Sequence, residues 1–351
     1  MTAAEESPTS VGPAAGRPEP GARNLFDEQR RNRRDTWLLL AGFVALLAFI
    51  GFGFDLFVLG AAGVARPGGV PLPLPIAASG AALLGMGSAW VGYRFGDRAV
   101  LASSFARLVT ADDAAPDVKR LTNVVTEMAI AAGVPMPRIY LIDEPDPNAF
   151  ATGRDPDHAS IAVTTGLLAS MNRDELQGVI AHEMSHVRNL DIRKMTVVAA
   201  LLGAVLLLSD WATRLRLGMP SSGNSKRRDG PSLGPLMVVL LVAWLLTVLL
   251  TPLIGRLLAT GVSRRREYLA DASGAELTRN PLGLASALRK LEAASAPTPR
   301  IHRGTAHLCI TDPLGNAVND REGWLADLFA THPPITDRVA RLEAMAYRRS
   351  A

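Results

Sequence analysis

Two long stretches near the start of the chain contain no charged side chain. The first covers residues 36–54 and stays apolar beyond Asp55, and the second covers residues 67–93. About 20 helical residues cross the hydrocarbon layer of a bilayer. We therefore predict membrane spans at about 36–60 and 70–93, in preference to two buried core helices. A cleaved signal peptide is disfavoured, because a long tail precedes the first run and no A-x-A site follows it cleanly.

Between residues 94 and 194 the pattern changes to that of a folded, water-soluble unit. Apolar positions in Lys119–Gly133 follow the helical period. Asn172 followed by Glu175 has the spacing of a capping box, so a helix is expected to begin there. A polar turn is expected at Gly153–His158. The short β-prone runs expected to form strands are Arg138–Ile142, Ala149–Thr152 and Ala159–Thr165.

Two further apolar runs separate this unit from the C-terminal part of the chain. Residues 196–209 are uncharged but short for a span, whereas residues 230–255 are amply long. We therefore expect a second transmembrane or re-entrant hairpin over 195–259. The helices expected after it are Arg264–Leu277, Pro281–Ala294 with Asn280 as its N-cap, and about Ile335–Arg348.

The composition agrees with this pattern and excludes several classes of protein. Of 351 residues, 48% are hydrophobic and 20% are charged, whereas ordinary soluble domains are about a quarter charged. This apolar content excludes disorder of the whole chain, although the polar, Pro- and Gly-rich residues 1–29 are expected to be disordered. The single cysteine, Cys309, excludes a disulfide scaffold and fits a reducing compartment. A scattered net charge of +4 does not indicate nucleic-acid binding.

The strongest chemical motif is His182-Glu183-Met184-Ser185-His186, which has the form H-E-x-x-H. Four residues along a helix rotate the chain by about 400°, so both imidazoles project from one face and can chelate one metal ion. Glu183 lies beside them and is placed to act on a metal-bound water rather than to bind the metal. The alternative is a helix with two ordinary histidines.

A catalytic zinc site needs a third protein ligand and an open position for water. The metzincin pattern requires glycine at position 189 and histidine at position 192, and Asn189 and Ile192 exclude it. Glu267 and Asp271 share one helical face, so Glu267 can be the ligand while Asp271 binds the far nitrogen of a ligand histidine. The alternative is that this face is solvated. Weaker candidates for the third ligand, in a polar loop, are His302 and His307.

Further motifs occur in order between the apolar runs. They are Asn148-Ala-Phe-Ala-Thr-Gly153, Ile161–Leu168, His182–His186, Ser263–Asp271, and Thr331–Pro334 with Arg338. With these motifs, residues 30–348 resemble the HtpX-type integral membrane zinc metalloproteases, a family that includes the CAAX prenyl proteases. The long Ala- and Pro-rich tail departs from the compact pattern of that family.

The resemblance implies a multi-pass endopeptidase of the cell inner membrane, with a cytoplasmic active site and a role in stress response and the quality control of misfolded or membrane proteins. It implies one Zn²⁺ per chain, held by His182, His186 and Glu267, with Glu183 as the catalytic base. The implied fold is a helical membrane part with an α+β, zincin-like catalytic domain that is mainly helical and has a small sheet. The expected divisions are a tail (1–29), a transmembrane hairpin (30–105), a first catalytic half (106–194), a second hairpin (195–259) and a second catalytic half (260–351).

Peptide hydrolysis requires two further elements. The oxyanion needs a donor besides the metal, and His332 and Arg338 are the candidates, mainly from the resemblance. His332 is equally explained as a turn residue before two prolines. An edge strand at 149–152 is expected to bind a peptide by backbone pairing, with these residues in contact with substrate: Asn148, Ala149, Phe150, Ala151 and Thr152. The expected partners are polypeptides, including membrane proteins, and the lipid bilayer, but not nucleic acid.

The metal site constrains the number of membrane crossings. His186 and Glu267 must meet at one ion, so the chain between them crosses the membrane an even number of times. Residues 196–209 and 230–255 therefore both cross, which gives four spans, or both form a re-entrant hairpin; we favour four spans. Basic residues near the early spans favour a cytoplasmic catalytic domain. Basic residues in the connecting loop, which four spans would place outside, oppose this: Arg214, Arg216 and Lys226–Arg228.

Two other function classes fit parts of the pattern. A catalytically silent membrane scaffold or chaperone with a structural zinc site would bind substrates without cleaving them. A transporter built from the four apolar segments is disfavoured, because nearly all ionisable residues lie outside those segments.

Overall fold

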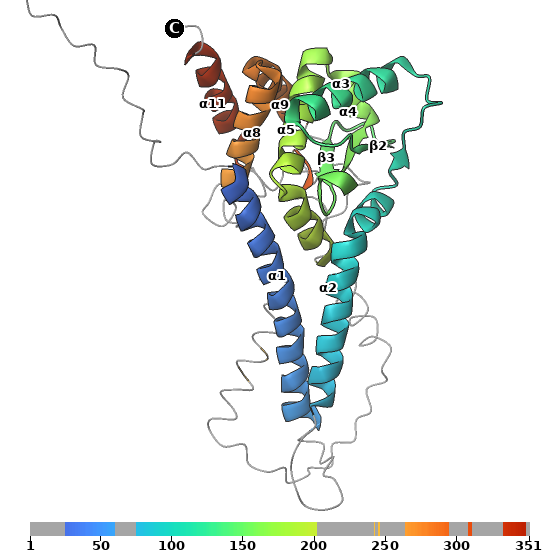
Figure 1. Cartoon of the computed structure of the whole chain (residues 1–351), viewed down its shortest axis with the longest axis vertical. Helices are drawn as coiled ribbons and strands as arrows, with labels where there is room; N and C mark the ends of the chain where they lie inside the picture. The colour runs from blue at the N-terminus through green and yellow to red at the C-terminus, as the bar shows by residue number, and fades with distance from the viewer. Residues whose placement is uncertain are drawn as a thin grey trace, which may run out of the picture.

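The protein consists of a compact body and a long helical hairpin that projects from it (Figure 1). The computed structural model describes residues 25–59, 75–201, 242, 245, 264–294, 308–310 and 333–348. Helix α1 (Leu25–Phe54) continues into a π-helical segment (Asp55–Leu59), and α2 (Ile76–Ser103) returns alongside it. Both are long and apolar enough to cross a membrane.

The hairpin exposes large apolar side chains along its length. Residues that are 58–71% exposed are Trp37, Leu38, Leu83, Leu84 and Trp90. Lipid tails solvate such side chains as well as another helix would, whereas water would not, so this surface suits a bilayer. The chain therefore has a membrane part with at least two candidate spans in its described residues.

The two helices meet closely at the tip of the hairpin, and this contact explains the isolated Asp55. A Cβ atom at Gly51 would lie 2.5 Å from the carbonyl oxygen of Ala77, so only glycine allows this approach. The carboxylate of Asp55 accepts hydrogen bonds from the backbone N–H groups of Ala77 (2.9 Å) and Ala78 (2.8 Å). Asp55 therefore caps α2 and satisfies donors that a membrane would leave unpaired.

The beginning of α1 corrects one expected boundary. Residues 25–29, predicted to belong to the disordered tail, are helical. The physical reason is tertiary: Gln29 donates a hydrogen bond to the carbonyl oxygen of Arg188 at 2.7 Å, so this polar turn is held against the body. The rest of the predicted tail, residues 1–24, lies outside the described residues.

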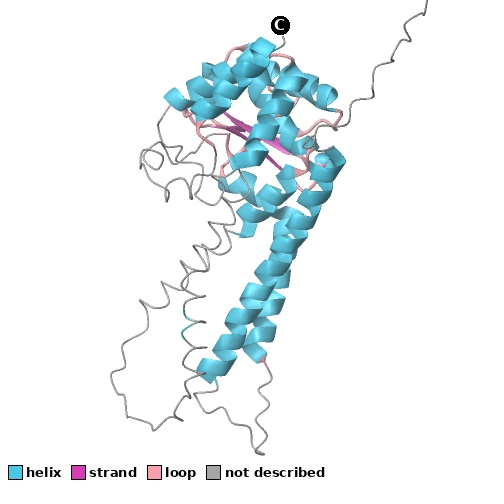
Figure 2. Cartoon of the chain, turned by 90° about the vertical axis from the view of Figure 1, so that its left-hand side faces the viewer, coloured by secondary structure: helices cyan, strands magenta, loops and turns pink. Residues whose placement is uncertain are grey.

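A four-stranded mixed sheet lies inside the body, between helices (Figure 2). Its strands are β1 (Arg107–Leu108), β2 (Arg138–Ile142), β3 (Ala149–Thr152) and β4 (Ser160–Thr164). The order is β1-β2-β4-β3, with β2 and β4 parallel and the other pairs antiparallel. The expected strands are thus confirmed, whereas β1 lacked a signal because two residues carry no periodicity.

Helix α5 (Arg173–Arg188) is the centre of the body and packs on β3 and three helices. A Cβ atom at Gly178 would lie 2.7 Å from the backbone nitrogen of Leu284, so glycine is required where α9 crosses α5. The remaining helices are α3 (Pro116–Ala132), α4 (Thr165–Ser170), α8 (Arg264–Thr278), α9 (Pro281–Ala293) and α11 (Ile335–Arg348), with a 3₁₀ turn at Pro156–His158. The helical predictions are confirmed within a few residues, including the Asn280 cap of α9, whose side chain accepts from Gly283 N–H.

Helical residues 191–201 lead from the body toward the hairpin. Thr196 and Ala200 lie against Gly96 of α2, and Val197 and Leu201 join a small apolar cluster with Leu40. Residues 195–201, where the second hairpin is expected to begin, therefore lie beside the first hairpin. Apart from 195–201, 242 and 245, its residues lie outside the described part of the chain.

Candidate metal and active site

The N-terminus of α5 is held by the predicted capping box. The Asn172 side chain accepts from the backbone N–H of Glu175, and the Glu175 carboxylate accepts from the backbone N–H of Asn172, both at 2.9 Å. These bonds satisfy two donors that the helix itself cannot pair. They therefore secure the start of the helix that carries H-E-x-x-H.

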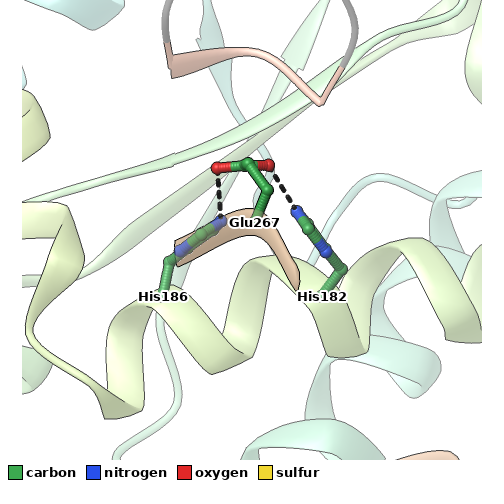
Figure 3. A group of neighbouring side chains, drawn as sticks. All are labelled: His182, His186 and Glu267. Atoms are coloured by element: carbon green, nitrogen blue, oxygen red, sulfur yellow. Dashed lines mark ion pairs between the residues drawn. The ribbon is translucent and has the colours of Figure 1, made fainter. Parts of the chain in front are cut away.

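His182 and His186 meet Glu267 of α8 in the interior of the body. The Nε2 atoms of His182 and His186 lie 3.5 and 3.8 Å from the two carboxylate oxygens of Glu267 (Figure 3). One ligand atom from each residue falls within a 4.8 Å group, and all three side chains are buried. The structure thus brings together the three predicted metal ligands. The rival ligands His302 and His307 lie outside the described residues.

The far nitrogen of His182 faces an ion pair. Its Nδ1 lies 2.9 Å from Asp271 Oδ1, and the Arg338 guanidinium donates from Nε (2.8 Å) and an Nη atom (2.7 Å) to the two oxygens of Asp271. Burial alone would raise the pKa of Asp271, but Arg338 lowers it to about 2. Burial would lower the pKa of His182, but hydrogen bonds to Asp271 and Glu267 raise it to about 9.

The far nitrogen of His186 faces a second carboxylate. Its Nδ1 lies 3.1 Å from Asp191 Oδ2, and Asp191 Oδ1 accepts a 2.6 Å hydrogen bond from the side-chain amide of Asn32. Burial lowers the pKa of His186. Sequence reasoning missed both partners. Asp191 follows the motif closely enough to be found, whereas Asn32 comes from α1 and has no local signal.

Glu183 lies between the two histidines along α5 and is 1% exposed. Among the described residues, its Oε2 has no hydrogen-bond partner, and its carboxylate accepts from the backbone N–H of Ala151. Burial, assisted by the charge of Glu267, raises the pKa of Glu183 to about 8. A cation among the three ligands would lower this pKa toward neutrality. A buried carboxylate of this kind has the properties of a general base.

The contacts of Arg338 differ from those expected of an oxyanion donor. The side chain is fully buried, and each of its three nitrogens already has an acceptor: two on Asp271 and, at 3.3 Å, the carbonyl oxygen of Ile310. These contacts support a role in which Arg338 holds Asp271 against the Nδ1 atom of His182. The other candidate, His332, lies outside the described residues.

The predicted substrate strand is the last strand in the sheet order, but part of its outer edge is already paired. Ile310 N–H donates to the carbonyl oxygen of Ala149 at 3.0 Å, and Cys309 pairs with Phe150 in an isolated bridge. All four residues of β3 are buried. Asn148, also predicted to contact substrate, is buried and accepts from Ala149 N–H through its side chain.

The class of the site is defined by three groups of side chains. They are the His182–His186–Glu267 cluster, the two carboxylates behind the histidines, and the buried Glu183 beside them. This is the ligand set of zinc peptidases that keep one position for water. The fold and the site therefore describe a membrane metallopeptidase.

Comparison with known proteins identifies the family. The profile of Peptidase family M48 matches residues 116–346, and this chain belongs to that family. It is a metallopeptidase, and the resemblance found in its motifs is confirmed.

Curated relatives match nearly the whole chain. A protein of Thermoanaerobacter pseudethanolicus described as "Protease HtpX homolog" is 42% identical over 325 residues, which are 92% of this chain and 98% of the relative. A protein of Limosilactobacillus fermentum with the same description is 42% identical over 326 residues, 92% of this chain and 100% of the relative. The crystal structure of S. mikatae Ste24p is similar with a TM-score of 0.44 and 18% identity, over 91% of this chain and 66% of that chain.

Proposed function

We propose that this protein is a zinc-dependent endopeptidase that cleaves misfolded or membrane proteins at a cytoplasm-facing site, in protein quality control. The observation that carries the proposal is the meeting of His182, His186 and Glu267 beside the buried Glu183. The descriptions of the relatives as proteases support it.

The residues present fit one zinc ion per chain. Two imidazole nitrogens and a carboxylate are the donors that zinc takes in catalytic sites. Beside them, Glu183 Oε2 is buried and has no hydrogen-bond partner among the described residues, so it can accept a hydrogen bond from a metal-bound water. When bound, zinc lowers the pKa of a coordinated water and polarises the carbonyl to be attacked.

The side chains of this chain supply the remaining chemistry. With Asp271 and Asp191 accepting from the Nδ1–H groups of His182 and His186, both Nε2 atoms, which face Glu267, would be left to bind the metal. Glu183 accepts a proton from the attacking water at its carboxylate and passes it to the leaving nitrogen of the peptide. Its nearness to both histidines along one helix turn puts this base beside the ligands.

Substrate is proposed to bind along β3, with Asn148 and Ala149–Thr152 as the contact residues. The support is the terminal place of β3 in the sheet and the hydrogen bond of Ala151 N–H to Glu183, which links this strand to the base. A peptide would compete with Cys309 and Ile310 for the outer edge of Ala149 and Phe150. Backbone pairing selects little by side chain, which suits a protease of misfolded proteins.

The test compares purified full-length wild type with Glu183→Gln. We expect about one zinc per chain in both, and kcat for casein cleavage reduced about 10²–10⁴-fold in the variant. Glu276→Gln makes the same exchange at an exposed position of α8 and is expected to keep zinc and activity. A wild type that binds zinc and casein but cleaves no faster than Glu183→Gln would overturn the endopeptidase and favour a silent scaffold.

The proposed orientation rests on the basic residues that precede the first span and Glu267. Four spans would place residues 218–229 outside the cell. A protease-accessible tag inserted there is expected to be cut from outside, and protection from outside would overturn the four-span topology.

A further inference from the structure

The polar beginning of α1 contacts the chain behind the metal site. Three of its side chains contact the chain just after the H-E-x-x-H motif. Gln29 donates to the carbonyl oxygen of Arg188 (2.7 Å), and Asp35 pairs with Lys194 (3.0 Å). Between them, Asn32 donates to the carbonyl oxygen of Asn189 at 3.0 Å and to Asp191 Oδ1 at 2.6 Å.

Asn32 differs from its two neighbours because its contact continues to a metal ligand. The other oxygen of Asp191 lies 3.1 Å from His186 Nδ1, so the amide, the carboxylate and the imidazole form one chain of contacts. Asn32, Asp191 and His186 are 7%, 2% and 2% exposed, so water does not compete for these groups. The backbone of Asn32 is also held, because its carbonyl accepts from the hydroxyl of Thr36 at 2.8 Å.

The chemistry of an amide suits this position. Asn32 can orient Asp191 without neutralising it, whereas an arginine or lysine would pair with the carboxylate and weaken its pull on the His186 Nδ1–H. A carboxylate with one oxygen fixed presents its other oxygen in a defined direction. The ring of His186, and with it the direction of its Nε2 lone pair, is then set from the membrane helix.

We propose that Asn32 is a positioning residue of the metal centre: by holding Asp191 it orients His186, so that tight metal binding requires α1 to be docked on the body. The inference rests on the proposed function, since it takes the His182–His186–Glu267 cluster to bind a metal. It adds a membrane-helix residue, from a contact that spans 159 positions of sequence, to a site otherwise built from the body.

The test measures metal binding rather than proteolysis. Full-length protein in detergent is titrated with zinc against a chelator, and the visible absorption of its cobalt form is recorded. Loss of a partner behind a ligand histidine weakens metal binding about 10–100-fold, and we expect Asn32→Ala to lie near the lower end and to shift the cobalt spectrum. The matched control is Gln29→Ala, which removes a neighbouring contact of α1 and is expected to leave affinity and spectrum unchanged.

A double-mutant cycle separates positioning from folding. In an Asp191→Asn background, Asn32→Ala is expected to have no further effect on affinity, because its route to His186 is already lost. The size-matched Asn32→Asp replaces the donor with a carboxylate that faces Asp191 and the Asn189 carbonyl, so it is expected to weaken metal binding more than Asn32→Ala does. Equal effects of Gln29→Ala and Asn32→Ala, or unchanged affinity in both Asn32 variants, would overturn the inference alone. A wild type that binds no metal would overturn the proposed function and the inference together.

Discussion

The two histidines proposed as metal ligands lie on one helix, but different elements with different chemistry contact their far nitrogens. Behind His182, Asp271 of α8 is paired with Arg338 of α11 in a two-point ion pair. Behind His186, Asp191 is paired with the neutral amide of Asn32 on α1. One carboxylate is thus paired with a buried cation, and the other with an uncharged amide.

The ion pair behind His182 and the amide contact behind His186 are expected to differ in how much each contributes to the stability of the fold. Removing one partner of a buried ion pair leaves an uncompensated charge and costs about 3–5 kcal/mol. The Asn32 amide is uncharged, and losing its hydrogen bond to the Asp191 carboxylate costs about 1.5–3 kcal/mol. The His182 side is therefore tied to the stability of the body, whereas the His186 side can change with the docking of α1 and leave the body folded.

The largest expected effect is that of Arg338→Leu. Removing the Arg338 guanidinium leaves Asp271 buried without a cation, so the free energy of unfolding is expected to fall by about 3–5 kcal/mol. Denaturant titration in detergent measures this change. The matched control is Arg341→Leu on the same helix, where the exposed guanidinium lies 3.7 Å from the ring centroid of Tyr268 and its loss is expected to cost about 0.5–1 kcal/mol. Equal stability of the two variants would contradict the ion-pair account.

A smaller effect is expected from removing either carboxylate. Asp271→Asn and Asp191→Asn should each weaken zinc binding about 10–100-fold, measured by chelator competition. Their stabilities should differ, because Asp271→Asn strands the charge of Arg338 and Asp191→Asn leaves only the neutral Asn32. If both variants unfold at the same denaturant concentration, the contacts behind His182 and His186 contribute equally to stability, and the proposed difference between them is wrong.

Local chemistry made much of this structure predictable. The i, i+4 spacing of His182 and His186, the capping box at Asn172 and the short strand at residues 149–152 depend on neighbours in sequence, and each is found as expected. Arg338 was predicted to belong to the site, but its contact with Asp271 was not predicted, because the two residues lie 67 positions apart in the sequence. Asn32 was missed for the same reason: residues before a predicted span give no indication that one of them reaches a metal ligand.

The smallest effect concerns the start of α5, which both histidines share. Burial alone would raise the pKa of Glu175, but hydrogen bonds from Lys290 (2.6 Å), Asn172 N–H (2.9 Å) and Ser286 (2.7 Å) hold that pKa below its usual 4.5. Glu175→Gln is expected to lower the free energy of unfolding by about 1–2 kcal/mol at pH 7, with zinc affinity unchanged. Because the folded pKa is depressed, the contribution of Glu175 is fully present above about pH 4.5 and is lost as pH falls through the folded pKa.

Unfolding titrations of wild type and Glu175→Gln across pH 3–7 should therefore converge at the acid end. The control is Asn280→Ala, which removes the side-chain cap of α9 and should cost about 1 kcal/mol. Asn280 does not titrate, so its difference from wild type should stay constant over the same range. A Glu175→Gln difference that is also constant would show that the carboxylate acts by shape and not by charge. A fall in zinc affinity in Glu175→Gln would show instead that the start of α5 is coupled to the metal site. The positions of His182 and His186 would then both depend on the capping box.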